Sequence, residues 1–463
     1  MTEDTLFLLL TFSIGLVTLG GVLFAYRRSR DSFHPLIYLG LILFFPYCYI
    51  PWELYSSHLA DLNFFLSTEQ RTLVQAINLL GIVSLLAGVL SGDGKIDRQN
   101  RQNRYQQIWR LPLKACKRFD RAAILFGVLG VAAYLYGIAN VGGFAAAYGH
   151  SYGGGWSGTG YAREALQWTL PALLWFMTTH VERKLTRPDW VWIGLFAFPL
   201  LTQGLLGARR GPTAMVVVVV FMGWYLIRRR RPTLKNLIAG SVALGMLLLF
   251  LLANRGEIYL GSDFDLKWSV GETYTTNVTS GNEFVYGSGV ILNAQQNNDY
   301  YWGGRYITSL FIRPIPRQLW PTQYADAARW FGIPNIAQTN AGTVGETWTL
   351  EWTPPKGAAP GMIADLWVEF WWYYLIALYL LGWFYGMAWR KAVTRGKLWI
   401  PVYTIAAALS IYFMQTFEAF AFRFMFMGFA IWVIWLYGKR ALGSKNTLTQ
   451  QTYFPPSNHQ PHP

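Results

Sequence analysis

The sequence contains few charged residues for its length. Of the 463 residues, 14% are charged, whereas an ordinary soluble domain carries about 25%. Hydrophobic residues make up 53% of the chain, so the polar side chains are too few to cover a water-soluble surface. Together with the apolar runs described below, this shortage excludes a soluble enzyme, a disordered protein and an ordinary nucleic-acid binder.

Cysteine and histidine are also rare. The two cysteines exclude a disulfide scaffold and a cysteine-rich metal site. Cys48 falls in an apolar run and Cys116 in a basic segment, so we expect two unpaired thiols. The sequence has no HExxH motif, which argues against a metalloprotease. The histidines in the body of the chain show no metal-ligand spacing: His34, His58, His150 and His180.

Apolar runs recur along the whole chain, each near the length that crosses a bilayer core. They predict an all-α polytopic membrane protein with about eleven transmembrane helices and one large extracytoplasmic loop between helices eight and nine. The predicted spans are 5–26, 34–52, 71–91, 120–139, 164–180, 189–206, 212–227, 236–253, 362–388, 398–415 and 424–438.

The basic residues predict the orientation of these spans. Arg27, Arg28 and Arg30 follow the first run, whereas Glu3 and Asp4 precede it. Because Lys and Arg stay on the cytoplasmic side, the N-terminus is expected outside and the C-terminus inside, and a cleaved signal peptide is not expected. With this alternation, about 27 Lys and Arg and about 6 Asp and Glu lie inside, against about 12 and 18 outside.

The spans divide the chain into four predicted parts. Residues 1–253 carry helices one to eight, 254–361 form the large loop, 362–440 carry the last three helices, and 441–463 form a disordered cytoplasmic tail. Most of the net charge of +15 is then explained by the excess of Lys and Arg on the predicted cytoplasmic side. The basic segment 92–119 and the four arginines from Arg228 are read as topology determinants that contact membrane lipid, so no nucleic-acid partner is predicted.

Arginines on the outer side are the candidate functional residues. Arg209 and Arg210 occupy a short outer turn, where they oppose the positive-inside bias. A guanidinium can grip phosphate with two hydrogen bonds and stays charged at any pH, so these two residues can form an anion clamp. The alternatives are snorkelling to lipid headgroups and pairing with a loop carboxylate.

Four further arginines lie on the same predicted side. Arg305, Arg313 and Arg317 belong to the large loop, and the last two stand among three prolines that stiffen the segment. Arg423 lies between the last two spans, where Glu418 could neutralise it. For Arg313, Arg317 and Arg423, a structural salt bridge and substrate contact both remain open.

Carboxylates near these arginines are candidate general bases. Glu346 lies in the large loop, and Asp365 and Glu369 are four residues apart, so they share one face of a helix. For Asp365 the alternative is a carboxylate that interacts with the positive end of a helix. The aromatic runs 300–302 and 371–374 could stack on sugar rings, although an interfacial belt is the other role for the second run.

Within the spans, charge is nearly absent, which argues against an ion-coupled transporter.

Taken together, the outer-face residues resemble the O-antigen polymerase (Wzy-type) or oligosaccharide repeat-unit polymerase family, which also includes the O-antigen ligases. The turn 207–211 looks like the family's Gly-Ser-Arg-Gly element, and 315–321, which includes Trp320, is similar to its Pro-Arg…Trp-Pro element. Gly345-Glu346 followed by 361–363, and the Gly-Gly-Phe loop 142–144, also fit.

The resemblance implies transfer of a glycan from an undecaprenyl-pyrophosphate carrier to a lipid-linked repeat unit at the outer face of a bacterial inner membrane. It implies no metal and no cofactor, and it allows a chain-length regulator and a flippase as partners. Under this hypothesis the candidate catalytic residues are Arg209, Arg210, Arg317, Glu346 and Asp365. The candidate substrate-binding residues are Arg305, Arg313, Arg423 and Trp320.

Two departures from the family pattern affect this expectation. Gln323 and Tyr324 stand where the family element often continues into Lys-Pro, so a lysine contact to phosphate is missing. The large loop contains no histidine, which favours a polymerase over a ligase. A flippase or exporter of lipid-linked glycan and a non-catalytic envelope scaffold remain the alternatives.

Overall fold

The structure is a computed structural model whose secondary structure is helical throughout the residues it describes. These are residues 3–56, 66–94, 112–150, 164–181, 185–207, 209–228, 230–254, 257–262, 283–315, 318–333, 336, 359–396 and 398–442. Over these ranges the chain forms α-helices with short 3-10 and π segments and no strand, so the all-α prediction is confirmed. The C-terminal tail, predicted to be disordered, lies outside them from residue 443 onward.

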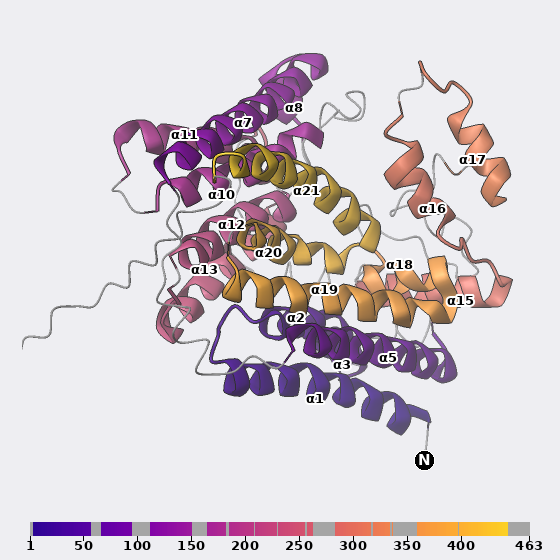
Figure 1. Ribbon diagram of the computed structural model, residues 1–463. Coiled ribbons are helices and arrows are strands. Elements are labelled where there is room, and N and C mark those ends of the chain that lie inside the picture. The colour runs from indigo at the N-terminus through magenta and orange to yellow at the C-terminus, as the bar shows by residue number, and fades with distance from the viewer. Residues whose placement is uncertain are drawn as a thin grey trace, which may run out of the picture.

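The helices fall into two groups along the chain (Figure 1). The first comprises α1 (Glu3–Ser29), α2 (Pro35–Phe44), α3 (Ile50–Ser56), α5 (Thr68–Asp93), α7 (Leu113–Val141), α8 (Phe144–Tyr148), α10 (Thr169–Thr179), α11 (Arg187–Leu205), α12 (Arg210–Ile227) and α13 (Leu234–Ala253). The second comprises α15 (Glu283–Asn297), α16 (Gly304–Ile307), α17 (Gln323–Phe331), α18 (Gly361–Phe370), α19 (Tyr374–Thr394), α20 (Trp399–Leu409) and α21 (Phe417–Lys439).

Helix occupies each of the eleven ranges predicted to cross the membrane. Among the described residues, five helical stretches are long and apolar enough to do so by length and composition. They are Asp4–Ser29, Pro35–Ser56, Thr68–Asp93, Leu113–Val141 and Phe417–Lys439. Three shorter apolar stretches are Gly211–Ile227, Lys235–Leu251 and Trp399–Met414. The protein is therefore a helical membrane protein by these criteria, while the number eleven and the orientation stay predictions.

The predicted span 362–388 is interrupted in the middle. Trp371 adopts a φ of 48°, so α18 ends at Phe370 and a short 3-10 turn (Trp371–Tyr373) leads into α19. Hydropathy is continuous across this point, which is why the sequence suggested one span. The break sets α18 apart as a helix of 10 residues, about 15 Å long, in which every residue from Gly361 to Glu369 is buried.

The large region between α13 and α18 contains folded helices rather than loop alone. The segment α15 packs against α18 and α5, and most of its residues are buried. The short α16 continues into a π-helix, η4 (Thr308–Ile312), and α17 follows it. In Figure 1, α16 and α17 lie at one edge of the molecule, beyond α15 and α18. These elements carry several of the candidate arginines.

Glycines allow α5 and α19 to pack with their backbones in contact. A Cβ on Gly88 or Gly92 would overlap the carbonyl oxygen of Tyr379 or Trp383, and a Cβ on Gly382 would overlap that of Leu85. Figure 1 shows the two helices side by side along much of their length. Close approach through small residues is a common way for helices to associate in a membrane, where no hydrophobic driving force acts between them.

We expect Gly382→Ala to destabilise the protein by about 1–3 kcal/mol, because the added methyl group must push two backbones apart. Thermal unfolding in detergent measures the effect. Gly194→Ala is the matched control, since Gly194 lies in α11 with open space around its Cβ position. The control is expected to leave the midpoint unchanged or to raise it slightly, because alanine favours helix. Equal midpoints for the two variants would contradict the backbone contact.

Candidate functional site

The structure describes most of the predicted site residues. Arg317 and Glu346 lie outside the described residues. Arg210 begins α12, but only its backbone is described. The remaining candidates are all described and divide between two neighbouring regions and a satellite core: Arg209, Arg305, Arg313, Trp320, Asp365 and Arg423.

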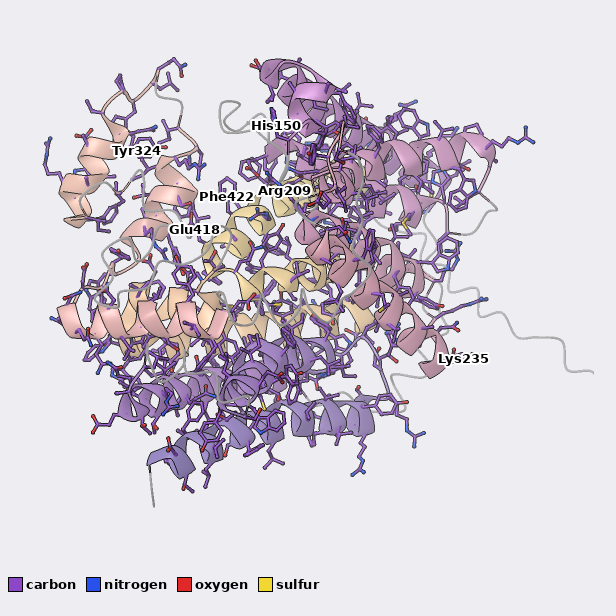
Figure 2. The ribbon with its side chains drawn as sticks, turned by 180° about the vertical axis from the view of Figure 1, so that it is seen from behind. His150, Arg209, Lys235, Tyr324, Glu418 and Phe422 are labelled. Carbon is purple, nitrogen blue, oxygen red and sulfur yellow. The ribbon has the colours of Figure 1, made fainter. Side chains whose placement is uncertain are left out.

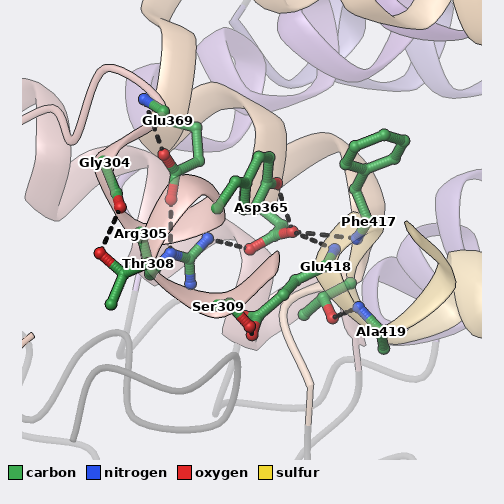
Figure 3. A network of polar contacts seen from close by, with 12 residues as sticks. Gly304, Arg305, Thr308, Ser309, Asp365, Glu369, Phe417, Glu418 and Ala419 are labelled. Carbon is green, nitrogen blue, oxygen red and sulfur yellow. Dashed lines mark hydrogen bonds and ion pairs between the residues drawn. The ribbon is translucent and has the colours of Figure 1, made fainter. Parts of the chain in front are cut away.

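Arg305 lies at the centre of a buried ion-pair cluster (Figure 3). Its Nε donates to Glu369 Oε1 at 2.5 Å, and its Nη2 donates to Asp365 Oδ1. The side chains of the three residues are no more than 1% exposed. The prediction that Asp365 and Glu369 share a helix face is confirmed, because both contact this one guanidinium from α18.

Asp365 also fixes the start of another helix. Its Oδ2 accepts hydrogen bonds from the backbone N–H of Phe417 at 2.9 Å and of Glu418 at 3.4 Å. The first backbone N–H groups of a helix lack partners within the helix and attract negative charge. The carboxylate–helix interaction considered for Asp365 is therefore present, but it involves the N-terminus of α21 rather than that of α18. Tyr306 donates a further hydrogen bond to the same oxygen at 2.6 Å.

Two buried polar atoms beside this cluster have no hydrogen-bond partner among the described residues. They are Arg305 Nη1 and Glu418 Oε2. The other Glu418 oxygen accepts from Ser309 Oγ of η4. A buried polar atom without a partner costs about 1–3 kcal/mol, so such atoms are uncommon in a folded protein and draw attention to the place where they occur. Arg305 Nη1 can therefore donate one further hydrogen bond, and Glu418 Oε2 can accept one.

Arg313 and Arg423 lie over two aromatic rings that define a second region. The Arg313 guanidinium lies 6.0 Å from the ring of Phe422, and that of Arg423 lies 4.1 Å from the ring of Tyr412. Within the described residues, no carboxylate is within 4.0 Å of either guanidinium, so the salt bridge from Glu418 to Arg423, one of the two alternatives, is not observed. Arg423 Nη1 donates to the carbonyl of Ala419 at 2.9 Å.

The turn that carries Arg209 lies next to this second region. Tyr412 Oη is 2.9 Å from the position that a Cβ of Gly211 would take, so the first turn of α12 borders the ring on which Arg423 stacks. Figure 2 shows Arg209, Phe422 and Glu418 in the same part of the molecule. Arg313 and Arg423 thus lie over the rings of Phe422 and Tyr412, and the turn that carries Arg209 borders Tyr412, although the three arginines are as much as 214 residues apart in the sequence. We call Arg209, Arg313 and Arg423 the arginine group.

Trp320 belongs to a small satellite core that also contains Ile312 and Ala327. Its Nε1 donates to Asp326 Oδ2 at 2.8 Å, and its ring lies 5.3 Å from that of Trp330. Hydrogen bonds from Thr322 and Trp320 lower the pKa of Asp326, which keeps this carboxylate charged. Through this hydrogen bond to Asp326, a residue of α17, Trp320 fixes the segment that leads into the helix.

Several residues of the site could not be found from the sequence. Tyr306, Ser309 and Tyr412 are ordinary polar residues in apolar or loop surroundings, and no motif marks them. Burial raises the pKa of Tyr301, although the nearby Arg305 lowers it in part, so this phenol stays protonated beside the cluster. The spacing of Asp365 and Glu369 was the one local signal, and it indicated a shared face without naming the partner.

The comparisons with known proteins assign neither a family nor a function to this site. No family model, no curated protein and no solved structure matches the chain.

Proposed function

We propose that this protein is a membrane glycosyltransferase that polymerises oligosaccharide repeat units carried on a polyprenyl pyrophosphate. The observation that carries the proposal is the pair Arg313 and Arg423. In the described part of the chain they lie near one end of α21 with no carboxylate in ion-pairing distance. Fixed guanidinium groups of this kind are suited to an anionic leaving group, because they stay charged and bind phosphate oxygens in pairs.

The reaction requires one bond exchange at an anomeric carbon. A hydroxyl oxygen of the acceptor sugar forms a bond to that carbon, and the bond to the pyrophosphate oxygen breaks. The electron pair and the negative charge of the broken bond leave with the pyrophosphate. Positive groups placed where this charge develops lower the barrier, and the arginine group supplies them from this chain's own residues.

A general base accepts the proton of the acceptor hydroxyl. Both Asp365 oxygens already accept hydrogen bonds from protein donors, which supports a positioning role for Asp365. Glu418 Oε2 has no such donor among the described residues, and the Glu418 carboxylate interacts electrostatically with both Arg305 and Arg313. We therefore assign the base to Glu418, with Glu346 as the other candidate. Arg305 serves as the fixed centre that holds α18 and the start of α21 in register.

The test is elongation of lipid-linked repeat units by the purified protein in detergent, where only one compartment exists. A polymerase extends the glycan under these conditions, whereas a flippase or an exporter does not. Transfer to an acceptor other than a second lipid-linked repeat unit would identify a ligase. Arg209→Lys with Arg210→Lys is expected to shorten the glycan ladder, because lysine cannot hold two phosphate oxygens at once. An unchanged glycan chain length in that double variant would show that Arg209 and Arg210 do not belong to the site.

A further inference from the structure

Two aromatic segments that are far apart in the sequence form one exposed surface. The Tyr300 ring lies 6.0 Å from that of Trp371, and the Trp302 ring lies 6.4 Å from that of Tyr373. Tyr300 and Trp302 themselves lie 6.2 Å apart. We call these four side chains the aromatic platform. It joins the segment before α16 to the break between α18 and α19.

The backbone of this surface has a positive φ at three positions. Asn298, Trp302 and Trp371 have φ values of 50°, 50° and 48°. Among the described residues, only one other non-glycine residue, Arg30, has a positive φ. Asn adopts such a conformation readily, whereas for a bulky residue such as Trp it costs about 1–3 kcal/mol, and strained positions cluster at functional sites. Three of the four thus fall at or beside one group of exposed rings.

Hydrogen bonds on both sides of Trp302 hold its strained conformation. The Tyr301 N–H donates to the carbonyl of Val368 at 3.0 Å, and the Gly303 N–H donates to Glu369 Oε2 at 3.0 Å. Glu369 is also the partner of Arg305 Nε. The platform is therefore attached to the same buried carboxylate that organises the candidate site.

The exposed rings are accompanied by amide and carboxylate groups. Trp302 and Tyr373 are 58% and 61% exposed, and Trp371 is 41% exposed. The residues just before Tyr300, from Gln295 to Asp299, are all exposed and carry four amides and one carboxylate. Flat rings offer a face to the C–H side of a pyranose, and side-chain amides both donate to and accept from sugar hydroxyls. A ring set built only for a membrane interface needs neither a strained backbone nor a run of amides.

We propose that the aromatic platform binds a sugar ring of the acceptor glycan by stacking, with the amides of 295–298 contacting its hydroxyls. This assignment rests on the proposed function, because it names the surface that holds the substrate of that reaction. The platform positions the acceptor beside the Arg305 cluster while the arginine group holds the donor pyrophosphate. A carbohydrate ring suits this surface better than an anionic headgroup, because the adjoining run contains Asp299 and no Lys or Arg.

The experiment measures sugar binding without any transfer reaction. Full-length protein in nanodiscs is titrated with oligosaccharides of one to three repeat units, released by mild acid from the cell's own surface glycan. Saturation-transfer NMR and tryptophan fluorescence follow the binding. Trp302→Ala and Tyr373→Ala are each expected to raise Kd at least tenfold. Trp190→Ala is the matched control, since Trp190 is 57% exposed at the start of α11 and contacts no other aromatic ring among the residues that the structure describes.

A second variant at the strained position separates binding from folding. Trp302→Gly removes the ring as alanine does, but glycine adopts a φ of 50° without strain. The glycine variant is therefore expected to melt no lower than Trp302→Ala while it loses sugar binding to the same degree. In the polymerisation assay, both are expected to raise the apparent KM for the acceptor with little change in kcat.

Two results would overturn the platform as a sugar site. One is the absence of saturable binding by the wild-type protein, and the other is an unchanged Kd in Trp302→Ala. Equal effects of Trp302→Ala and Trp190→Ala on membrane insertion, with no sugar binding, would identify an interfacial belt and also overturn it. Binding that depends on Trp302 in a protein that elongates nothing would keep the platform and refute the transferase. A protein that elongates the glycan, but binds sugar independently of Trp302, would keep the transferase and refute the platform.

Discussion

Arg305→Ala is expected to destabilise the protein by about 3–5 kcal/mol, because Asp365 and Glu369 would remain buried without their counter-charge. The loss extends beyond this pair, since Asp365 also holds the start of α21. Thermal unfolding in detergent and the yield of folded protein measure the effect. Arg305→Lys is expected to recover only part of it, because one ammonium replaces two differently placed donors.

A compensating variant tests whether charge is the cause. Arg305→Met combined with Asp365→Asn and Glu369→Gln removes the buried charges together and is expected to melt well above Arg305→Ala. Arg329→Ala serves as the control for removing an arginine, since Arg329 is 79% exposed on α17 and should change stability by less than about 0.5 kcal/mol. A melting temperature for Arg305→Ala equal to that of the control would contradict the cluster.

The sequence predicted the helical class and the positions of the helices well, because both depend on local hydropathy. It predicted poorly the features that depend on distant contacts. The break at Trp371 is one example, since a positive φ at a tryptophan is stabilised only by the structure around it. The continuous apolar run from 362 to 388 gave no local sign of it.

The pairing of charges was the second feature that sequence reasoning missed. Arg305 was grouped with the substrate-binding arginines, whereas its guanidinium is held by two carboxylates 60 and 64 residues away. Arg231, read only as a topology determinant, binds Asp31 through Nε at 2.5 Å and Nη2 at 2.8 Å. Spacing along a helix reveals which residues share a face, as it did for Asp365 and Glu369. It does not reveal which distant residue that face meets.

The arginine group depends both on the predicted topology and on contacts between distant segments in the fold. The predicted topology placed Arg209, Arg313 and Arg423 on one side of the membrane, and the fold brings their segments together around Tyr412 and Phe422. Arg305 is the same residue type as Arg313 and Arg423, and only its surroundings set it apart. A guanidinium that two carboxylates bind directly stabilises the fold, whereas one with no carboxylate in ion-pairing distance keeps hydrogen-bond donors for an anion.

Arg423→Ala is accordingly expected to lower the rate of glycan elongation about 10²–10³-fold, the usual effect of removing one group that stabilises developing negative charge. Folding should survive, because the alanine variant gives up the stacking on Tyr412, worth about 0.5–1 kcal/mol, and one hydrogen bond to Ala419. The rate is measured with purified protein and lipid-linked repeat units, beside a melting curve for each variant.

The controls decide whether the loss of rate reflects phosphate binding. Arg423→Lys keeps the charge but not the paired donors, so it should fall between wild type and Arg423→Ala. Arg329→Ala removes an exposed arginine outside the arginine group and should elongate at the wild-type rate. If Arg313 and Arg423 hold the same pyrophosphate, the double alanine variant should lose less than the product of the two single losses, because residues that act as a unit are not additive. An Arg423→Ala rate equal to that of Arg329→Ala would exclude Arg423 from the site, and the function would then have to be sought without the arginine group.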